Sequence, residues 1–227
     1  MESKPNRLNQ PSATSGWLQR LRWYFRNNRF QQEMRRRRMR RFLDTIRPPQ
    51  GARIIDLGGT EELWRLIDHD FSVTLVNITE QRRLSHDSRY TYVTADACNL
   101  SDLYQDREFD VAYSNSVLEH VGDDNHQQQF SREIQRLGKA YWVQVPHPSF
   151  PIEAHTGVPF FWQLPNAMRR FLMRRWRKRL PAWTRMVDET RPVPYQRMKA
   201  LFPEAEVDIE RFMLIPKSIF VYRRQRD

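Results

Sequence analysis

The sequence predicts an α/β fold with a mostly parallel sheet, and three observations support this prediction. Short runs of β-branched and aromatic residues alternate with helical stretches through the middle of the chain. Such alternation implies parallel strands joined by right-handed crossovers. The length of 227 residues suits one domain of this class with additions, and is too short for two full enzymes.

The middle of the chain is expected to form five strands, at residues 53–57, 72–77, 91–94, 110–114 and 141–145. The clearest helix between strands begins near Asp124 and carries Phe130, Ile134 and Leu137 on one face. It ends at Gly138, where a glycine suits a left-handed cap.

Two further strands are expected near the C-terminus. The segment AEVDIERFMLIPKSIFVYRR contains two strand-like runs separated by Pro216 and Lys217. Proline cannot donate a hydrogen bond to a neighbouring strand, so it belongs at an edge or a turn. We therefore expect a hairpin at the edge of the same sheet.

Basic helical segments flank this sheet region. Apolar residues recur at helical spacing around the run Arg35–Arg38, and Met168, Phe171, Leu172 and Trp176 form a second apolar stripe beside arginines. The first residues are polar and lack periodicity, which predicts disorder. The expected organisation is a disordered lead, a basic amphipathic helical extension, an α/β domain and a helical insertion in that domain, at residues 1–16, 17–50, 51–227 and about 160–193.

Net charge narrows the classes of partner. The chain has 38 lysines and arginines against 27 acidic residues, a formal net charge of +11. An excess of this size favours polyanionic partners or anionic membrane surfaces. We interpret the basic helices first as ordinary helices, with their charged faces in solvent and their apolar stripes packed against the sheet. The second interpretation is a peripheral contact with an anionic membrane, and the third is a nucleic-acid surface.

Several features exclude other classes of protein. No apolar run approaches the ~20 residues of a membrane span, and the first residues lack a signal-peptide core. We therefore expect a cytoplasmic protein, with the inner face of the membrane as its candidate membrane contact. Cys98 is the only cysteine, so neither an intramolecular disulfide nor a cysteine-based metal cluster can form, and no metal site is expected.

Polar residues and glycines follow each of the five expected strands at the point where it ends. They are Asp56, Gly58, Gly59 and Thr60 after the first strand, Asn77 after the second, Asp96 after the third, Asn115 and His120 after the fourth, and His147, Glu153 and His155 after the fifth. Ligands of open α/β sheets bind outside the carboxyl ends of the strands, so we expect one site along this edge. The glycines allow the backbone to approach a ligand closely.

The ordered segments IIDLGG, VTLVN, VTADACNL, FDVAYSNSVLEHV and PKSIFV resemble the class I S-adenosylmethionine-dependent methyltransferases. The similarity is greatest to the bacterial small-molecule group called methyltransferase type 11. It covers about residues 53–159 and, less fully, the final hairpin. The resemblance implies a Rossmann-like fold with a mostly parallel seven-stranded sheet and an antiparallel C-terminal hairpin. It also implies S-adenosyl-L-methionine as cofactor and transfer of its methyl group.

The resemblance also assigns residues to the cofactor site. They are Asp56, Gly58, Gly59 and Thr60 at the methionine half, Asn77 and Ile78 at the ribose, Asp96 and Ala97 at the adenine, and Asn115 and Ser116 over the reactive sulfur. Two residues depart from the family pattern, because Asn77 replaces an acid and Glu62 replaces a glycine. Hydrogen bonds to charged groups contribute about 1.5–3 kcal/mol against about 1 kcal/mol for neutral ones, so we expect modest cofactor affinity.

Methylation of an oxygen benefits from a general base. His155 and His147 are the leading candidates, and Glu153 lies on the same face as His155 if the segment is extended. The segment FPIEAH, which contains Glu153 and His155, is equally interpreted as a rigid connector. His120 is a further candidate on the substrate side, and its alternative role is to cap or pack a helix. The expected acceptor is a small molecule or a sugar- or lipid-linked hydroxyl, since SNSVLEH lacks the Asn/Asp-Pro-Pro-aromatic signature of exocyclic-amine methylation.

Three alternatives stay open. A basic RNA-binding methyltransferase would bind RNA with a strong dependence on salt. A non-catalytic protein with the methyltransferase fold would bind the cofactor weakly or not at all, with Glu62 and Asn77 as the reason. A nicotinamide-dependent oxidoreductase is least favoured, because Gly-x-Gly-x-x-Gly would require glycines at Thr60 and Leu63.

Overall fold

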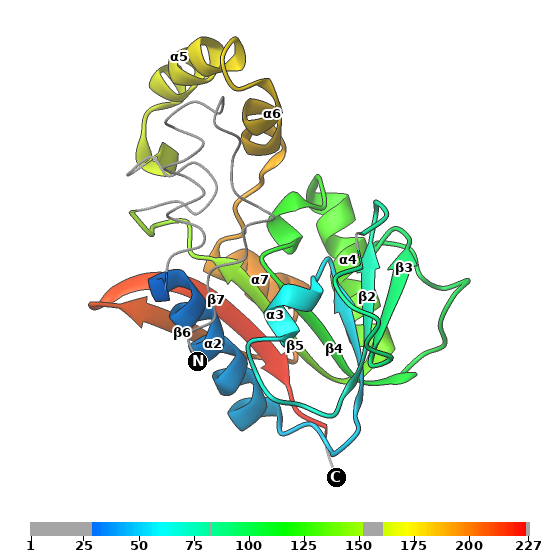
Figure 1. Ribbon diagram of the computed structural model, residues 1–227. Coiled ribbons are helices and arrows are strands. Elements are labelled where there is room, and N and C mark those ends of the chain that lie inside the picture. The colour runs from blue at the N-terminus through cyan, green and yellow to red at the C-terminus, as the bar shows by residue number, and fades with distance from the viewer. Residues whose placement is uncertain (1–28, 82, 152–160, 226–227) are drawn as a thin grey trace.

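A seven-stranded sheet forms the middle layer of the computed structural model, which describes residues 29–81, 83–151 and 161–225 (Figure 1). Its strands are β1 (Arg53–Leu57), β2 (Ser72–Asn77), β3 (Tyr90–Thr94), β4 (Phe109–Asn115), β5 (Gly138–Pro146), β6 (Glu206–Phe212) and β7 (Ile215–Arg223). The helices are α2 (Arg29–Ile46), α3 (Glu61–Trp64), α4 (Asp124–Leu137), α5 (Asn166–Arg177), α6 (Pro181–Glu189) and α7 (Tyr195–Leu201). Two short 3-10 turns are η2 (Leu118–His120) and η3 (Phe161–Gln163).

The strand order is β3-β2-β1-β4-β5-β7-β6. Strands β1 to β5 pair in parallel, and β7 runs antiparallel to both of its neighbours. From β1 the chain moves outward to β2 and β3, then returns to place β4 on the other side of β1. This reversal defines the point where ligands of such sheets bind. The predicted fold class, including the antiparallel hairpin, is confirmed.

All five middle strands are present, but the expected alternation with helices is confirmed only after β1 and β4, where α3 and α4 follow; the described residues between β2 and β3 and between β3 and β4 form no helix. Helix α4 buries Phe130, Ile134 and Leu137 completely, as its periodicity predicts. Asp123 caps this helix, because its side chain accepts hydrogen bonds from two amide groups of the first turn.

The left-handed cap predicted at Gly138 is wrong. Gly138 has a φ of −100° and is the first residue of β5. A Cβ atom at this position would lie 2.3 Å from the carbonyl oxygen of Ala140 and 2.6 Å from the amide nitrogen of Ala112. A glycine is therefore required by crowding between β4 and β5, and not by the end of the helix.

The C-terminal hairpin is present, but its turn lies earlier than predicted. Pro216 and Lys217 belong to β7, and the turn is formed by Met213 and Leu214, which have φ values of 47° and 72°. Pro216 pairs with Arg211 next to an irregularity in the β6–β7 register. Because β7 pairs with β5 only from Ser218 onward, Pro216 has a neighbouring strand on the β6 side alone, and at such an irregular position the proline does not end the strand.

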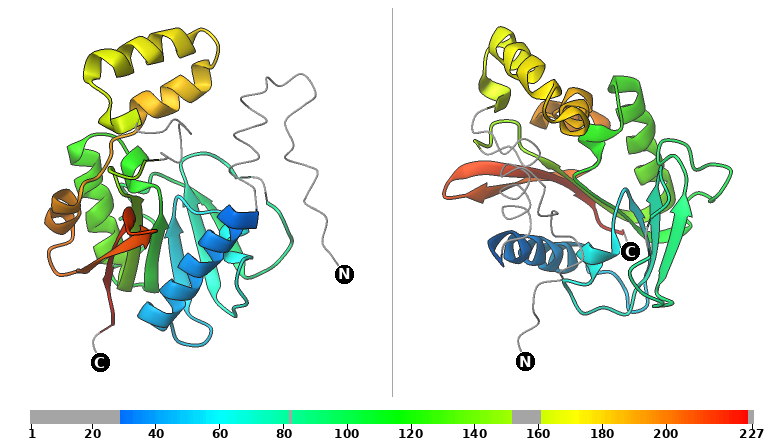
Figure 2. Two further views of the ribbon diagram at one scale, coloured as in Figure 1. Left: turned by 90° about the vertical axis from the view of Figure 1, so that its left-hand side faces the viewer. Right: turned by 45° about the horizontal axis from the view of Figure 1, so that its top comes forward.

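The sheet lies between two helical layers (Figures 1 and 2). Helices α4 and α7 cover one face, and α2 covers the other. Phe42 of α2 is fully buried, with its ring 6.0 Å from Trp64, 5.0 Å from Tyr113 and 6.0 Å from Trp142. The second half of the predicted basic extension is therefore part of the core. Its first half lies outside the described residues.

Helices α5 and α6 stand beyond the carboxyl edge of the sheet, at the top of Figure 1. Phe161, Met173 and Val187 form a small separate core there. Met168 and Phe171 are 51% and 63% exposed, so the interpretation of the α5 apolar stripe as packing against the sheet is wrong for these two side chains. The reason is that α5 packs mainly against α6 and does not contact the sheet through this face.

Candidate active site

The turn after β1 packs against the segment after β4. Gly58 has a φ of +80°, which favours glycine, and its amide donates to the carbonyl oxygen of Val76 at 2.8 Å. A Cβ atom on Gly58 would lie 2.5 Å from Cγ2 of Val117. The glycine turn therefore packs directly against the segment after β4, at the carboxyl ends of β1 and β4, where the strand order reverses.

Asp56 is a buried carboxyl group beneath this turn. Trp64 Nε1 donates to its Oδ2 atom at 2.8 Å, and Oδ1 has no hydrogen-bond partner among the described residues. Burial raises the pKa of Asp56 to about 7, against the opposing effect of the bond from Trp64. A Cβ atom on Gly59 would fall 1.7 Å from Oδ2, so the second glycine is required by the packing of Asp56.

Asn77 holds the glycine turn with its side-chain amide. Its Nδ2 atom donates to the carbonyl oxygen of Gly59 at 2.9 Å, and Gln81 Nε2 donates to the same oxygen at 2.8 Å. An ionised aspartate could not donate this hydrogen bond to Gly59, which gives a structural reason for an asparagine at position 77. Among the described residues no donor reaches the amide oxygen of Asn77, which can accept a ribose hydroxyl. Ile78 follows with 75% exposure.

The two acids at the start of α3 differ in their surroundings. Glu62, which replaces a family glycine, is exposed, whereas Glu61 is buried. The Glu61 carboxylate accepts hydrogen bonds from Ser85, Tyr92 and Arg65. Burial alone would raise the pKa of Glu61, but these bonds and the Arg65 charge outweigh it and lower the pKa. Glu61 thus ties the segment after β2 to α3, while Thr60 precedes α3 with an exposed side chain that does not cap it.

Asp96 lies in a turn after β3 and is exposed. Its Oδ1 atom accepts from the amide of Cys98 at 2.9 Å, which orients the carboxylate. Ala97 is half-buried and packs against the core. Burial, followed by the charge of Asp96, raises the pKa of the Cys98 thiol to about 12, so this thiol is not a nucleophile at neutral pH.

Arg38 of α2 forms hydrogen bonds that link the end of β4 to the three strands that follow it in the sheet order. Its Nη1 atom donates to Asn115 Oδ1 at 2.9 Å and to Gln144 Oε1 at 3.0 Å. Its Nη2 atom donates to Glu210 and to Ser218, each at 3.3 Å. These four acceptors come from β4, β5, β6 and β7, so one arginine spans four neighbouring strands.

This arginine is almost fully enclosed. The side chains of Arg38 and Glu210 are 11% and 13% exposed, and Arg38 Nε has no hydrogen-bond partner among the described residues. The interpretation of Arg35–Arg38 as a solvated face is therefore wrong at position 38. Position 38 lies four residues from the buried Met34 and Phe42, and this spacing was the available signal.

Ser116 follows Asn115 in a left-handed conformation, with a φ of 57°. This region costs a residue with a side chain about 1–2 kcal/mol. Two bonds to Gln144 hold it there: the Ser116 amide donates to the main-chain oxygen, and Ser116 Oγ donates to Oε1, each at 2.9 Å. Asn115 and Ser116 are thus fixed from both sides, by Arg38 and by β5.

The histidines are distributed differently. His147 follows β5, and its Nδ1 atom accepts from the amide of Ser149 at 3.1 Å. Burial lowers the pKa of His147, and the charge of Arg211 lowers it further, so the ring is neutral at neutral pH with its proton on Nε2. His120 lies in η2 with Nδ1 3.3 Å from Thr190 Oγ1. Glu153 and His155 lie outside the described residues.

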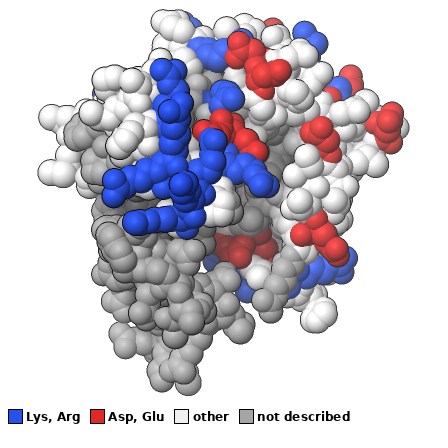
Figure 3. All heavy atoms as spheres, turned by 90° about the horizontal axis from the view of Figure 1, so that it is seen from above, with Lys and Arg blue, Asp and Glu red and all other residues white. Residues whose placement is uncertain are grey.

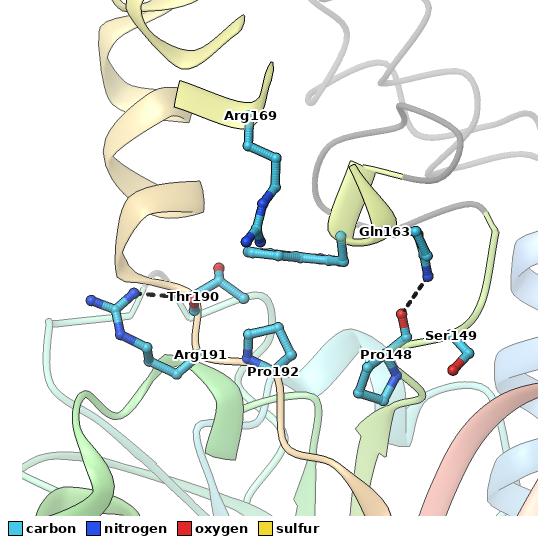
Figure 4. A pocket seen from close by; sticks show the side chains of 8 residues that line it. Pro148, Ser149, Gln163, Arg169, Thr190, Arg191 and Pro192 are labelled. Carbon is cyan, nitrogen blue, oxygen red and sulfur yellow. Dashed lines mark hydrogen bonds between the residues drawn. The ribbon is translucent and has the colours of Figure 1, made fainter. Parts of the chain in front are cut away.

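A hollow of about 530 Å³ opens next to the end of β5 (Figure 4). Pro148 and Ser149 form one side of it, Thr190 and Pro192 form another, and Arg169 projects toward it from α5. Ser149 and Thr190 are the hydrogen-bond partners of His147 and His120. Both histidines therefore contact residues that line the same hollow.

Other kinds of site find little support in the described part of the chain. There, no group of three or more histidine, cysteine or acidic side chains is arranged to hold a metal ion. The described helices include none with the length and apolar character needed to cross a membrane.

Comparison with known sequences agrees with this geometry. Residues 53–140 match the family model described as a methyltransferase domain. Two uncharacterized proteins of Mycobacterium tuberculosis, MT1557 of strain CDC 1551 and Rv1509 of strain H37Rv, are each 26% identical to the chain over 129 residues. The match covers 52% of this chain and 44% of each relative, so it spans less than half of their length.

Solved structures share the fold. A S-adenosylmethionine-dependent methyltransferase of Archaeoglobus fulgidus has a TM-score of 0.57 at 12% identity, covering 92% of this chain and 100% of its own. The Burkholderia thailandensis 1,6-didemethyltoxoflavin-N1-methyltransferase, bound to 1,6-didemethyltoxoflavin and S-adenosylhomocysteine, has a TM-score of 0.56 at 14% identity, covering 91% of this chain and 88% of its own.

The sheet order and the strand reversal give this chain the fold of solved S-adenosylmethionine-dependent methyltransferases. Residues 53–140, less than half of the chain, match the methyltransferase domain family, and this match indicates a methyltransferase domain with S-adenosylmethionine as the cofactor.

The residues at the switch point fit this cofactor. Asp56 offers a buried carboxyl oxygen without a partner among the described residues, and Asp96 offers an exposed carboxylate. The glycine turn and the Asn115–Ser116 segment lie at the carboxyl ends of the paired strands β1 and β4.

Proposed function

We propose that the chain methylates a hydroxyl oxygen of a small molecule or of a sugar- or lipid-linked acceptor. The observation that carries this proposal is the hollow beside the end of β5, which opens at the carboxyl edge that holds the switch-point residues. The Burkholderia thailandensis relative acts on a small molecule, which is in keeping with an acceptor of this size.

Cofactor residues are assigned within the same proposal. Asp56 and the glycine turn hold the methionine end, Asn77 the ribose with its amide oxygen, and Asp96 the adenine. Asn115 and Ser116 lie over the sulfur, and Arg38 acts as a positioning residue because it fixes Asn115. When bound, S-adenosylmethionine supplies an electrophilic methyl group. Alignment of reacting groups of this kind can supply about 7–11 kcal/mol of the barrier.

Oxygen methylation releases the proton of the acceptor hydroxyl, and a side chain must receive it. The Nδ1 atom of His147 accepts a hydrogen bond from the amide of Ser149, so the ring carries its proton on Nε2. From there it can donate a hydrogen bond to the oxygen of the methyl acceptor. We assign the general base to His155, oriented by Glu153, and a substrate-side contact to His120. The assignments of Glu153 and His155 rest on the sequence.

Calorimetry with S-adenosylmethionine and S-adenosylhomocysteine tests the proposal. Binding of both is expected, and no detectable binding of either would support a non-catalytic protein instead. Asp96→Ala is expected to weaken binding about tenfold or more, since it removes the carboxylate assigned to the adenine. His155→Ala should preserve binding and reduce turnover on a panel of sugar and lipid-linked hydroxyls. The opposite pattern for the two variants would refute these roles.

We also propose a peripheral contact with an anionic membrane. Its support is the outward face of α5, where Met168 and Phe171 are exposed beside Arg175. Sedimentation is expected with anionic liposomes and not with neutral ones, and Phe171→Ser should reduce it. Absence of the protein from both pellets would remove this part of the proposal.

A further inference from the structure

Four arginines of helix α5 line an open hollow. This second hollow, of about 440 Å³, lies between α5 and the end of α6. The residues of α5 that line it are spaced by three and four positions, which places them on one helical face. They are Asn166, Arg169, Arg170, Met173, Arg174 and Arg177. Met168 and Phe171 lie on the opposite face and are exposed, whereas Met173 is buried in the small core.

The charges around this hollow are poorly balanced. Five arginines and one carboxylate line it, and the carboxylate of Asp188 pairs with Arg177 at 2.7 Å. Arg169 bonds to the amide oxygen of Asn166, and Arg191 bonds to main-chain oxygens. Arg170 and Arg174 form no ion pair with any described residue. Figure 3 shows the resulting cluster of basic side chains on the face that carries the insertion.

Converging guanidinium groups repel one another unless an anion lies between them. The planar guanidinium fork matches phosphate oxygens in two hydrogen bonds at once, which makes arginine the preferred side chain for phosphate recognition. Trp162 adds an apolar surface, with the Arg169 guanidinium 5.6 Å from its ring centre. The hollow thus combines anion donors with a surface for the organic part of a ligand.

The two hollows are adjacent. Trp162, Arg169, Thr190 and Arg191 line both of them. The first hollow extends from these residues to Ser149, three residues after β5, so an anion held by α5 would lie on the side of the proposed acceptor hollow. We propose that the methyl acceptor carries a phosphate or pyrophosphate group, which the arginines of α5 that line the second hollow bind. This inference rests on the proposed function, because it names the class of its substrate.

Inorganic pyrophosphate is a suitable probe, titrated by calorimetry into the chain saturated with S-adenosylhomocysteine. We expect binding that Arg170→Ala/Arg174→Ala weakens at least tenfold. The matched control is Arg175→Ala/Arg179→Ala, which removes two exposed arginines that line neither hollow, and it should change affinity less than twofold. Retained affinity for S-adenosylhomocysteine shows that each variant is folded.

The outcomes separate this inference from the proposed function. Binding of S-adenosylhomocysteine without binding of pyrophosphate would overturn the phosphate subsite alone. Equal weakening in both double variants would also overturn it, because the attraction would then be general. RNA binding that falls equally in both variants and strongly with salt would support a nucleic-acid surface instead. If the wild-type chain did not bind S-adenosylhomocysteine at all, the proposed function itself would be overturned.

A final arm identifies the source of the phosphate. Vesicles of phosphatidylglycerol should compete with pyrophosphate if the group belongs to a lipid, and phosphatidylcholine vesicles serve as the control. Competition lost in Arg170→Ala/Arg174→Ala supports a lipid phosphate in the hollow. Undiminished pyrophosphate binding in the presence of both vesicles supports a soluble phosphorylated acceptor.

Discussion

Helices α2 and α5 have similar compositions but differ in which of their side chains are buried. Both combine runs of arginine with regularly spaced apolar residues. In α2 the apolar face packs on the sheet, and the one arginine on that face, Arg38, is buried against Glu210 and three polar side chains. In α5 the arginine-bearing face lines a hollow, and Met168 and Phe171 point to solvent. Amphipathicity identified both helices, but it did not determine which face each helix buries.

The physical reason is the surface that each helix meets. The apolar face of α2 meets a sheet face with Trp142, Tyr113 and Phe220, where burial of apolar area contributes about 25 cal/mol per Å². Helix α5 lies beyond the sheet edge, where the described residues offer no comparable apolar surface to Phe171. Its orientation is set by the small core around Met173 and by the hollow.

The largest expected effect is that of Arg38→Ala. Removal of one partner from a buried ion pair leaves the other charge uncompensated, which typically costs about 3–5 kcal/mol. We expect the free energy of unfolding in urea to fall by that amount. Arg37→Ala, on the same helix with a 69% exposed side chain, should change it by less than about 0.5 kcal/mol. Similar losses for the two variants would show that Arg38 is not specially placed.

A matched pair of phenylalanines compares the two helices directly. Phe42→Ala should destabilise the chain by about 3–5 kcal/mol, because it removes a fully buried ring that contacts three other rings. Phe171→Ala should change the free energy of unfolding by less than about 0.5 kcal/mol. Thermal unfolding of both variants without ligands measures the difference. A large loss at Phe171 would mean that α5 buries its apolar face after all.

Asp56 contrasts with Arg38, because it is a buried ionisable group without an ion-pair partner among the described residues. Burial raises the pKa of Asp56 from 3.8 to about 7, so the folded state binds a proton more tightly than the unfolded state does, and protonation favours folding. That contribution is complete below pH 3.8 and is lost as pH rises through about 7. It amounts to about 4 kcal/mol at most. Urea unfolding of the ligand-free chain from pH 4 to pH 8 should show it.

Asp56→Asn is the control, because its amide cannot titrate and can still accept from Trp64. The wild-type chain should lose stability relative to this variant between pH 4 and pH 7, and the difference should be constant above pH 8. Parallel curves across the whole range would contradict the raised pKa.

Two adjacent acids give the smallest effects. Glu61→Ala removes the buried acceptor of three side chains and should cost about 1–3 kcal/mol, with faster amide exchange at Leu84, whose amide faces that carboxylate. Glu62→Ala should stay within about 0.5 kcal/mol. Hydrogen exchange and urea unfolding measure both. If Glu62→Ala caused the larger loss, the family departure at position 62 would be the important one.

Much of the fold could be predicted from local sequence. The five middle strands, the buried stripe of Phe130, Ile134 and Leu137, and the C-terminal hairpin follow from periodicity, which depends only on neighbouring residues. A helix between every pair of strands does not follow, since β2, β3 and β4 are joined by described segments without one. The polar residues at strand ends were also predictable, because parallel strands bring their carboxyl ends to one edge.

Details of turns and caps were less predictable. Gly138 matched a helix cap, but contacts with Ala112 and Ala140 decide its role, and one of these residues lies on a different strand. Pro216 matched a turn, but pairing with Arg211 includes it in a strand. In both cases a residue with two local interpretations is assigned by a neighbour distant in sequence.

The sequence by itself determined the class of fold, the edge of the sheet where polar residues gather and the family resemblance, because each depends on periodicity or on the order of motifs. Only the tertiary structure decided that Arg38 bonds to Asn115, that Glu61 is the buried acid, and that four arginines of α5 line one hollow. These outcomes depend on which charge finds a partner and which apolar surface is available, and both are set by elements that lie far apart in the chain.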